Sequence, residues 1–376
     1  MPEEPISMSF PDLEEEDVRA VLEVLPTGRL SLGPRLEEFE RSLAAWVGVR
    51  HAVGVSSGTA ALHLIVKALG LGPGDEVLVP SFTFAASVNA ILYERATPVF
   101  VDIEPETYNL DPADLESKVG ARTRAILAVD VFGHPADWDA ILDVARRRGL
   151  VAIDDSCEAL GAEHRGTRLG SLGAAAAFAF YPNKQITTGE GGMIVTDDGD
   201  LARLARSLRN QGRSEMGAWL EHERLGYNYR MDEMSAALGV SQLRRLPAHL
   251  ERRDRVARMY GERLAEIDLV RPPRAFPWAR PSWFVYVVTL APGLDRRPVL
   301  EAMERRGIPV RAYFSPIHRQ PYIRNEFALE CADLPVTEDV ARRTVALPFH
   351  NRLTEGEVER VVRALREAIA EGDGKR

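Results

Sequence analysis

The sequence predicts an α/β fold with a mostly parallel central sheet flanked by helices, followed by a smaller C-terminal α+β domain. Apolar runs of strand length alternate with helix-period segments through roughly the first 200 residues, as in parallel sheets covered on both faces. After Arg230 this alternation changes to one long helical pattern. The 376 residues also exceed the size at which single cores usually stop growing. We expect a large α/β domain with an N-terminal helical segment at 1–245, and a connecting helix with a small domain at 246–376.

The strands of the predicted sheet come from apolar runs in the first part of the chain. They are 51–55, 76–82, 97–103, 123–132, 150–156, 175–181 and 192–197. Helix-period segments at 57–70 and 136–149 lie between them. Ligand sites in such sheets lie outside the carboxyl ends of the strands. Residues that follow each run are therefore the first candidates for a site.

The C-terminal third begins with a helical pattern at 231–267, which we expect Pro247 to kink or split. A segment rich in Pro and Arg follows at 270–283 and indicates an irregular connection. Strand patterns at 284–290 and 308–314, a helix at 297–307 and a last helix near 354–370 then complete the predicted small domain.

Composition excludes several classes of function. The net charge of -9 and the scattered arginines disfavour a nucleic-acid-binding protein, which needs a concentrated basic face. No apolar run approaches membrane-spanning length, and the acidic N-terminus lacks the layout of a secretion signal. Cys157 and Cys331 have no metal-binding spacing, so no metal or iron–sulfur cluster is expected. A reducing, cytoplasmic location fits best.

The turn Ser56-Ser57-Gly58-Thr59 ends one predicted strand and opens a helix. Its free N–H groups and hydroxyls suit a phosphate at the positive end of the helix dipole. An ordinary N-cap explains the same residues.

Two carboxylates end the strand at 150–156. By alternation Asp155 lies on one face of the sheet and Asp154 on the other. One of them therefore points into the crevice, where a protonated ring nitrogen of a cofactor would be a suitable partner. Capping of the following turn by either Asp is the alternative.

Lys184 and Phe84 are two further candidate residues for the same site. Lys184 follows an apolar strand and precedes Gly189, Gly191 and Gly192, which allow close backbone approach. A desolvated lysine is a nucleophile that forms Schiff bases, and an aromatic ring at position 84 could stack on a planar ring. A surface lysine and a core phenylalanine are the alternatives. Phosphate cup, carboxylate, aromatic ring and lysine on separate strand ends together indicate a pyridoxal phosphate site.

The strings SSGTAAL, GDEVLVPSFTFAAS, FYPNKQITTGEGGMIVTDD and LGYNYRMDEMSAALGVSQL resemble the DegT-type (DegT/DnrJ/StrS) sugar aminotransferases, over nearly the whole chain. The resemblance implies a fold type I enzyme that uses pyridoxal 5′-phosphate. It would move an amino group from an amino acid, with glutamate as the expected donor, to a nucleotide-linked keto sugar. By position Lys184 matches the Schiff-base lysine, Asp155 the partner of the pyridine nitrogen, Phe84 the stacking residue, and Gly58 and Thr59 the phosphate cup. Asn228 matches a residue that reaches the phosphate of the neighbouring subunit, which implies a homodimer with shared active sites.

Two positions depart from the family pattern. Ala179 stands where a serine usually contacts the phosphate, so one hydrogen bond worth roughly 1.5–3 kcal/mol is missing unless replaced. Glu158 stands where Gln or His is common near the phenolic oxygen of the cofactor. This acid would either repel an ionised oxygen or be protonated and donate to it.

The substrate side is less well defined by sequence. Arg209, Arg213 and Arg230 could bind a diphosphate or form surface ion pairs. Tyr313 and His318 match a family segment that borders the substrate pocket, although a lone His is more often structural.

Three rival functions remain. Sugar dehydratases of the family carry histidine in place of Lys184, relatives with an iron–sulfur cluster need more cysteines, and a regulatory or sensor protein would only hold the cofactor. The intact nucleophile, ring acid and stacking residue favour an aminotransferase.

Overall fold

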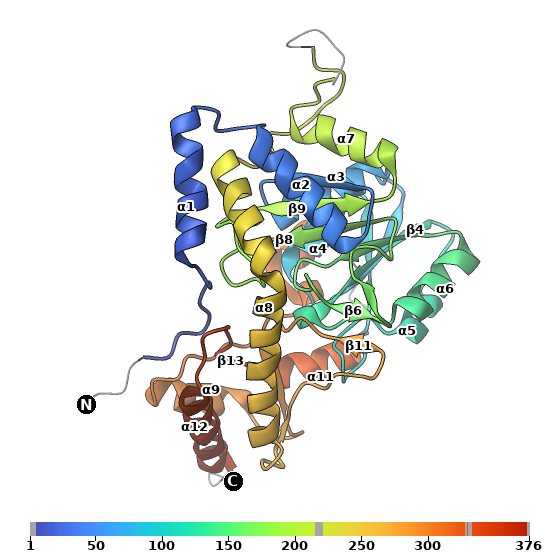
Figure 1. Ribbon diagram of the computed structural model, residues 1–376. Helices are drawn as coiled ribbons and strands as arrows, with labels where there is room; N and C mark the ends of the chain where they lie inside the picture. The colour runs from blue at the N-terminus through green and yellow to red at the C-terminus, as the bar shows by residue number, and fades with distance from the viewer. Residues whose placement is uncertain (1–4, 215–220, 328, 330–332, 374–376) are drawn as a thin grey trace.

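A seven-stranded sheet forms the centre of the computed structural model, which describes residues 5–214, 221–327, 329 and 333–373 (Figure 1). The strand order is β1-β9-β8-β5-β4-β2-β3. β9 runs antiparallel to both of its neighbours, and the other pairs are parallel. The mostly parallel sheet predicted from the sequence is therefore confirmed. The strands are β1 His51–Val55, β2 Glu76–Pro80, β3 Thr97–Val101, β4 Thr123–Val129, β5 Val151–Asp155, β8 Ala175–Ala179 and β9 Gly192–Thr196.

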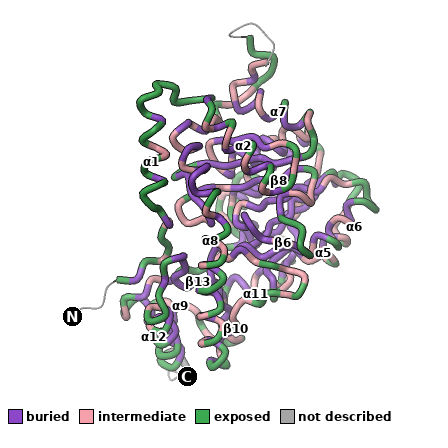
Figure 2. Tube along the Cα trace, in the orientation of Figure 1, coloured by how far each residue is buried: buried purple, intermediate pink, exposed green. Residues whose placement is uncertain are grey.

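Helices cover both faces of this sheet. They are α2 Pro34–Val47, α3 Gly58–Ala68, α4 Ala85–Tyr93, α5 Pro112–Ser117, α6 Trp138–Arg148 and α7 Gly199–Arg209. On one face α3, α4 and α7 pack on alternate strand residues such as Val77 and Val79. On the other face Leu78 is buried with α5 and α6, while α2 covers β8 and β9. Figure 2 shows the strands buried at the centre of these layers.

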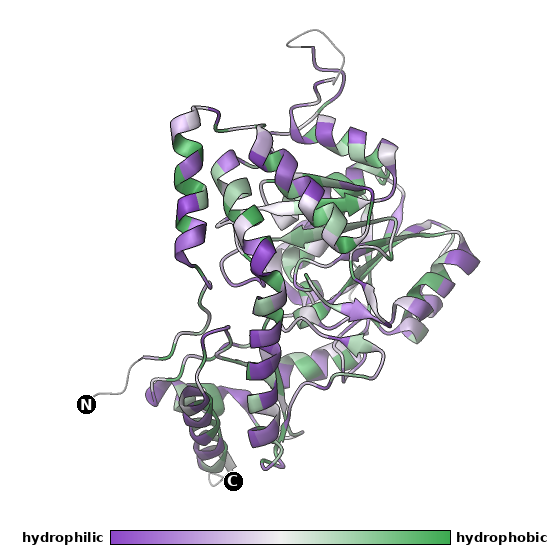
Figure 3. Ribbon diagram, viewed as in Figure 1, coloured by the Kyte–Doolittle hydropathy of each residue, from purple (hydrophilic) through white to green (hydrophobic). Residues whose placement is uncertain are grey.

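The long helix α8 (Glu233–Leu264) runs from the central sheet to the C-terminal part of the chain without a break (Figure 1). Of the two outcomes predicted at Pro247, a kink or a split, the split does not occur. Proline removes one helical hydrogen bond and crowds the preceding turn, but buried residues hold α8 on both sides of it. Leu243 and Leu246 lie in the core beside β8, and Val256 and Tyr260 lie in the C-terminal core. Many residues in the second half of α8 are hydrophilic (Figure 3).

A second, antiparallel sheet lies in the C-terminal part, in the order β10-β12-β13. Its strands are β10 Val270–Arg271, β12 Tyr286–Leu290 and β13 Thr344–Leu347, packed with α9 (Arg296–Arg305) and α12 (Glu355–Asp373). The strand predicted at 308–314 is wrong, because only an isolated bridge between Arg311 and Ala346 forms there. Pro309 in this segment has no N–H to donate to a ladder.

Shorter elements complete the fold. They are α1 Glu15–Val24, α10 Pro321–Glu326, α11 Pro335–Arg343, three 3₁₀ turns at Leu25–Thr27, Val131–Gly133 and Ile317–Arg319, and the small sheet of β6 Glu163–His164, β7 Thr167–Arg168 and β11 Ala279–Arg280.

No helix in the described ranges is both long and apolar enough to cross a membrane. Cys157 is free, and Cys331 lies outside the described residues. The domain boundary at 245/246 stays a prediction.

A buried acid pair lies behind β5. Ser156 Oγ is 2.6 Å from Asp154 Oδ1 and 2.9 Å from Asp130 Oδ2. A hydroxyl has one proton to donate, so one carboxyl must itself donate to Ser156. Asp130 also accepts the indole N–H of Trp138, whereas Asp154 accepts only the N–H of Gly170. Burial and repulsion from Asp130 hold the pKa of Asp154 well above its usual range, and we assign the proton to Asp154.

Asp154→Asn is expected to flatten the dependence of stability on pH. Between the ordinary pKa of an aspartate and the raised pKa of Asp154, the carboxyl is ionised in the unfolded chain but protonated in the folded chain. Folding therefore takes up a proton in this pH range, and the free energy of unfolding falls as the pH rises towards the raised pKa. This slope approaches about 1.4 kcal/mol per pH unit. Asparagine still donates to Ser156 and accepts from Gly170, but cannot ionise.

Urea unfolding at a series of pH values measures this slope. Asp268→Asn, at an exposed position, is the matched control and should keep the wild-type slope. A wild-type slope in Asp154→Asn would contradict the assigned proton.

Candidate active site

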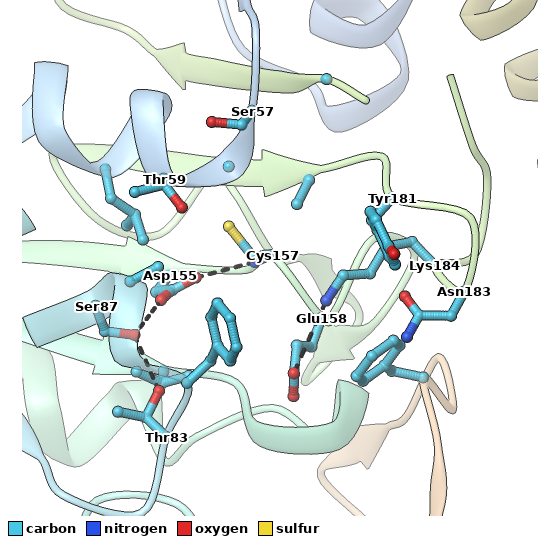
Figure 4. A pocket seen from close by; sticks show the side chains of 18 of the residues that line it. Ser57, Thr59, Thr83, Ser87, Asp155, Cys157, Glu158, Tyr181, Asn183 and Lys184 are labelled. Atoms are coloured by element: carbon cyan, nitrogen blue, oxygen red, sulfur yellow. Dashed lines mark hydrogen bonds and ion pairs between the residues drawn. The ribbon is translucent and has the colours of Figure 1, made fainter. Parts of the chain in front are cut away.

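A cavity of about 410 Å³ opens at the carboxyl ends of the central strands (Figure 4). It receives residues from the segments that follow β1, β2, β5 and β8, as the strand-end rule predicts. Of the residues predicted for the site, its lining includes Ser57, Gly58, Thr59, Phe84, Asp155, Glu158, Lys184 and Tyr313. The residues predicted from the sequence therefore make up about half of the polar side chains that line this cavity.

Asp155 lies at the end of β5 and is 4% exposed. Its Oδ2 accepts the hydroxyl of Ser87 at 2.7 Å, and its Oδ1 accepts the N–H of Cys157 at 3.2 Å. Because Ser87 gives its only proton to Asp155, Thr83 must be the donor in the 2.9 Å contact between the two hydroxyls. Both donors fix the orientation of the Asp155 carboxyl group. Asp155 therefore faces the cavity, and Asp154 belongs to the buried pair on the opposite face, as alternation predicts.

The turn after β1 forms the N-terminus of α3. Ser57 caps this helix, because its Oγ accepts the N–H of Ala60 at 3.1 Å. Ser57 also lines the cavity. It therefore caps the helix and is also placed to contact a ligand. A Cβ on Gly58 would lie 2.7 Å from Cβ of Ala179 and 2.9 Å from Sγ of Cys157, so only glycine fits. The turn combines a close-packed backbone with the positive end of a helix, which suits an anion.

Lys184 extends into the cavity from the segment after β8 (Figure 4). Its Nζ lies 3.8 Å from Oε1 of Glu158 and 3.8 Å from the centre of the Phe284 ring. Its side chain is 11% exposed. The alternative of a surface lysine is therefore excluded.

Glu158 stands beside Lys184 in the buried wall. Its Oε2 accepts the N–H of Phe132 at 2.9 Å. Burial raises the pKa of Glu158, and the charge of Lys184 opposes this shift. Once Lys184 is neutral the opposing charge is lost, and the protonated, donating form of Glu158 becomes more favourable.

Several lining residues were missed by sequence reasoning. Asn183 adjoins Lys184, and Thr83 and Ser87 flank the Phe84 position, so proximity to a predicted residue was their only signal. The others are Leu62, Ala86, Val129, Cys157, Tyr181, Glu190, Phe284 and Phe314. Phe284 and Phe314 come from the C-terminal third.

Other candidate residues lie outside the cavity lining. The Arg230 guanidinium donates to Oδ1 of Asn210 at 3.1 Å, and Asn228 is exposed on the segment that pairs with Asn210. Arg213 is half-buried and pairs with His222 through the backbone.

Two further candidates are engaged in structural contacts. Arg209 forms a buried ion pair with Glu40 and donates to the carbonyl of Gly54 at 2.6 Å. His318 is buried between Ser81 Oγ, 2.6 Å from its Nδ1, and Glu338, 2.8 Å from its Nε2. Burial lowers the pKa of His318, with Glu338 opposing this shift. Its two nitrogens are thus occupied by these partners.

Comparison with known proteins agrees with the resemblance. The model of the DegT/DnrJ/EryC1/StrS aminotransferase family matches residues 11–366. The chain is 42% identical to a GDP-perosamine synthase of Caulobacter vibrioides, covering 97% of this chain and 98% of the relative. It is 39% identical to dTDP-3-amino-3,4,6-trideoxy-alpha-D-glucose transaminase of Streptomyces venezuelae, covering 96% and 94%. The structure of Helicobacter pylori PseC, an aminotransferase of pseudoaminic acid biosynthesis, matches with a TM-score of 0.93 at 29% identity, covering 98% and 100%. The chain belongs to the DegT/DnrJ/EryC1/StrS aminotransferase family.

Proposed function

We propose that this aminotransferase moves the amino group of glutamate to a nucleotide-linked keto sugar, with pyridoxal 5′-phosphate as cofactor. The observation that carries the proposal is the cavity in which Lys184, Asp155 and the N-terminus of α3 meet. Relatives of this chain carry the names of transaminases or synthases of GDP-, dTDP- and UDP-linked amino sugars. Because three nucleotides occur in these names, the nucleotide of this chain has to be found by experiment.

The residues present fit the proposed cofactor. A phosphate would lie at Ser57, Gly58 and Thr59, where Gly58 allows the close packing and Ser57, capping through its lone pair, keeps its proton to donate. Asp155 would hold a protonated ring nitrogen, and Phe84 would stack on the ring. When bound, pyridoxal 5′-phosphate supplies an aldehyde that takes up the amino group and a ring that stabilises a carbanion.

Each residue then has a defined task. Asp155, fixed by the hydroxyl of Ser87 and the N–H of Cys157, can hold a proton on the cofactor ring. Nζ of Lys184 is the base that takes a proton from the substrate carbon and returns it. The carboxyl group of Glu158, whose Oε1 lies 3.8 Å from that amine, can carry a proton next to the amine. The aromatic wall of Phe284, Tyr313 and Phe314 limits access of water.

The acceptor side of the proposal uses the remaining candidates. We assign Tyr313 to the substrate wall, because it lines the cavity, and Arg213 and Arg230 to a diphosphate. For His318, whose nitrogens are occupied by Ser81 and Glu338, we propose support of the segment after β2. A cytoplasmic location is also proposed.

Two half-reactions measured separately test the function. Protein loaded with pyridoxal 5′-phosphate should convert glutamate to 2-oxoglutarate in an amount equal to the sites, without any acceptor. Nucleotide-linked keto sugars are then screened for return of the amino group. A sensor protein would leave glutamate unchanged, and this result would contradict the proposal.

We further propose a homodimer with shared active sites. Apolar side chains are exposed on α1, where Val18 and Leu22 lie one turn apart, and Phe84 at the cavity is 64% exposed. Such surfaces are typical of interaction sites. Asn228, exposed and outside the cavity of its own chain, is proposed to reach the phosphate in the partner's site.

Mixing two inactive variants tests this arrangement. Lys184→Ala and Asn228→Asp are each expected to be inactive, but a mixed dimer contains one intact site. After dissociation and random reassociation, roughly a quarter of wild-type activity should return, since half of the dimers are mixed. Lys184→Ala mixed with Asp155→Asn is the control. In that mixture both lesions come from the same cavity, so a mixed dimer has no intact site. Equal activity in the two mixtures would contradict shared sites.

A further inference from the structure

Arg253 of α8 binds backbone carbonyls in two segments of the chain, the one that contains Lys184 and the one that contains Phe284. Its Nη1 donates to the carbonyl of Trp283 at 2.8 Å and to that of Phe284 at 3.2 Å. Its Nη2 donates to the carbonyl of Lys184 at 3.0 Å and makes a longer contact of 3.5 Å with that of Asn183. One guanidinium therefore joins the segment of the reactive lysine to a segment about a hundred positions further along the chain.

Arg253 achieves this as a buried cation. It is 3% exposed, and no carboxylate of the described residues forms an ion pair with it within 4.0 Å. Burial lowers its pKa to about 10, with the charge of Asp12 opposing the shift. Burying an unpaired charge is costly, so a role in packing alone would be served better by an apolar side chain.

The two segments that Arg253 joins meet again inside the cavity. The Phe284 ring lies 3.8 Å from Nζ of Lys184, and both residues line the cavity. Neighbouring residues of α8 hold the same lysine segment: His249 Nδ1 lies 3.2 Å from the carbonyl of Gln185, and Gln242 accepts the N–H of Thr187 at 3.4 Å. Only Arg253 also binds the backbone of Phe284 among these three.

We propose that Arg253 is a positioning residue, which fixes the amine of Lys184 against the Phe284 ring by binding the carbonyls of both residues. The expected effect of Arg253 on catalysis rests on the function proposed above. Arg253 contacts backbone carbonyls, so it acts through Lys184 and Phe284. A shift of about 1 Å in a reacting group can lower a rate by about 10²-fold.

Lysine at this position cannot do the same. Its ammonium is a single point of donation, whereas the planar guanidinium reaches two segments at once. Arg253→Lys keeps the buried charge and is expected to bind one segment only. Arg253→Met, which removes the charge, is the second variant if Arg253→Lys does not fold.

Arg296→Lys is the matched control. Arg296 also donates to two carbonyls, those of Ala341 and Thr344, and burial also lowers its pKa, but it lies outside the cavity. Any general loss from replacing a carbonyl-binding arginine should appear in this variant too.

Two measurements decide the inference. The first is the rate at which acetic anhydride labels Lys184, read by mass spectrometry on protein without cofactor. Because the amine is released from its fixed place, Arg253→Lys should change this rate about threefold or more, and Arg296→Lys should leave it unchanged. The second is steady-state kinetics, where kcat of Arg253→Lys should fall about tenfold or more while KM for glutamate stays within about threefold.

Labelling and kcat equal to wild type in Arg253→Lys, with only its stability lowered, would overturn the inference. Failure of the proposed function would show differently, as absence of amino transfer in the wild-type protein. The labelling comparison needs neither cofactor nor turnover, so it decides the role of Arg253 in that case as well.

Discussion

Lys184→Ala is expected to abolish covalent attachment of pyridoxal 5′-phosphate and to lower kcat/KM by about 10⁴-fold or more. Lys184 is the only amine among the described residues that line the cavity, and its Nζ lies in the buried wall beside Glu158. No other described side chain there can form a Schiff base with an aldehyde. The fold should persist, because burial already raises the pKa of Glu158 and this acid can take up a proton when the cation is removed.

Visible absorbance of the loaded protein and turnover of glutamate measure the two effects, and circular dichroism checks the fold. Lys118→Ala provides the control: Lys118 pairs with Asp114 and donates to the carbonyl of Phe100, outside the cavity. It should load cofactor and turn over as the wild type does. Covalent loading of Lys184→Ala would place the reactive amine elsewhere and refute the assignment.

The central sheet was predictable because each of its strands contains a short apolar run. A strand buried on both faces is mostly apolar, so the run itself carries the signal. The segment 308–314 shows the limit of this signal. It is apolar enough for a strand, but Pro309 lacks the N–H that a ladder needs, and only the Arg311 bridge forms.

At Pro247 the local pattern allowed a split that does not occur. Its local cost to a helix is real, yet Leu246 and Tyr260 anchor α8 in two different cores, and such packing is not visible in a local pattern. Tertiary contacts decide helix continuity when both halves of the helix are buried.

At the site, residues that follow strand ends could be predicted because a parallel sheet brings its carboxyl ends to one edge. Lys184 and Asp155 belong to this group. Phe284 and Arg253 could not be predicted, since their roles depend on contacts across about 30 to 100 positions of sequence, which no local spacing encodes. His318 matches a family segment that borders the substrate pocket, but a lone histidine is more often structural, and both of its nitrogens lie against Ser81 and Glu338.

Asp155→Asn is expected to lower the rate of the glutamate half-reaction by about 10²–10⁴-fold, the factor that corresponds to losing a buried charge pair worth about 3–5 kcal/mol. Asparagine matches the shape of aspartate and should fold. Its oxygen can accept the N–H of Cys157, and its amide group can donate to Ser87, whose hydroxyl then turns towards Thr83. What the variant lacks is the negative charge at the end of β5.

The pH dependence separates loss of charge from loss of structure. If Asp155 acts by holding a proton on the ring nitrogen, solvent can supply that proton at low pH, so the rate of Asp155→Asn should recover in part as pH falls. Ser87→Ala, which removes one donor but keeps the carboxylate, should cost only about tenfold. A half-reaction rate within threefold of wild type in Asp155→Asn would mean that this carboxylate does not serve the cofactor, and the constellation around Lys184 would need another source of charge.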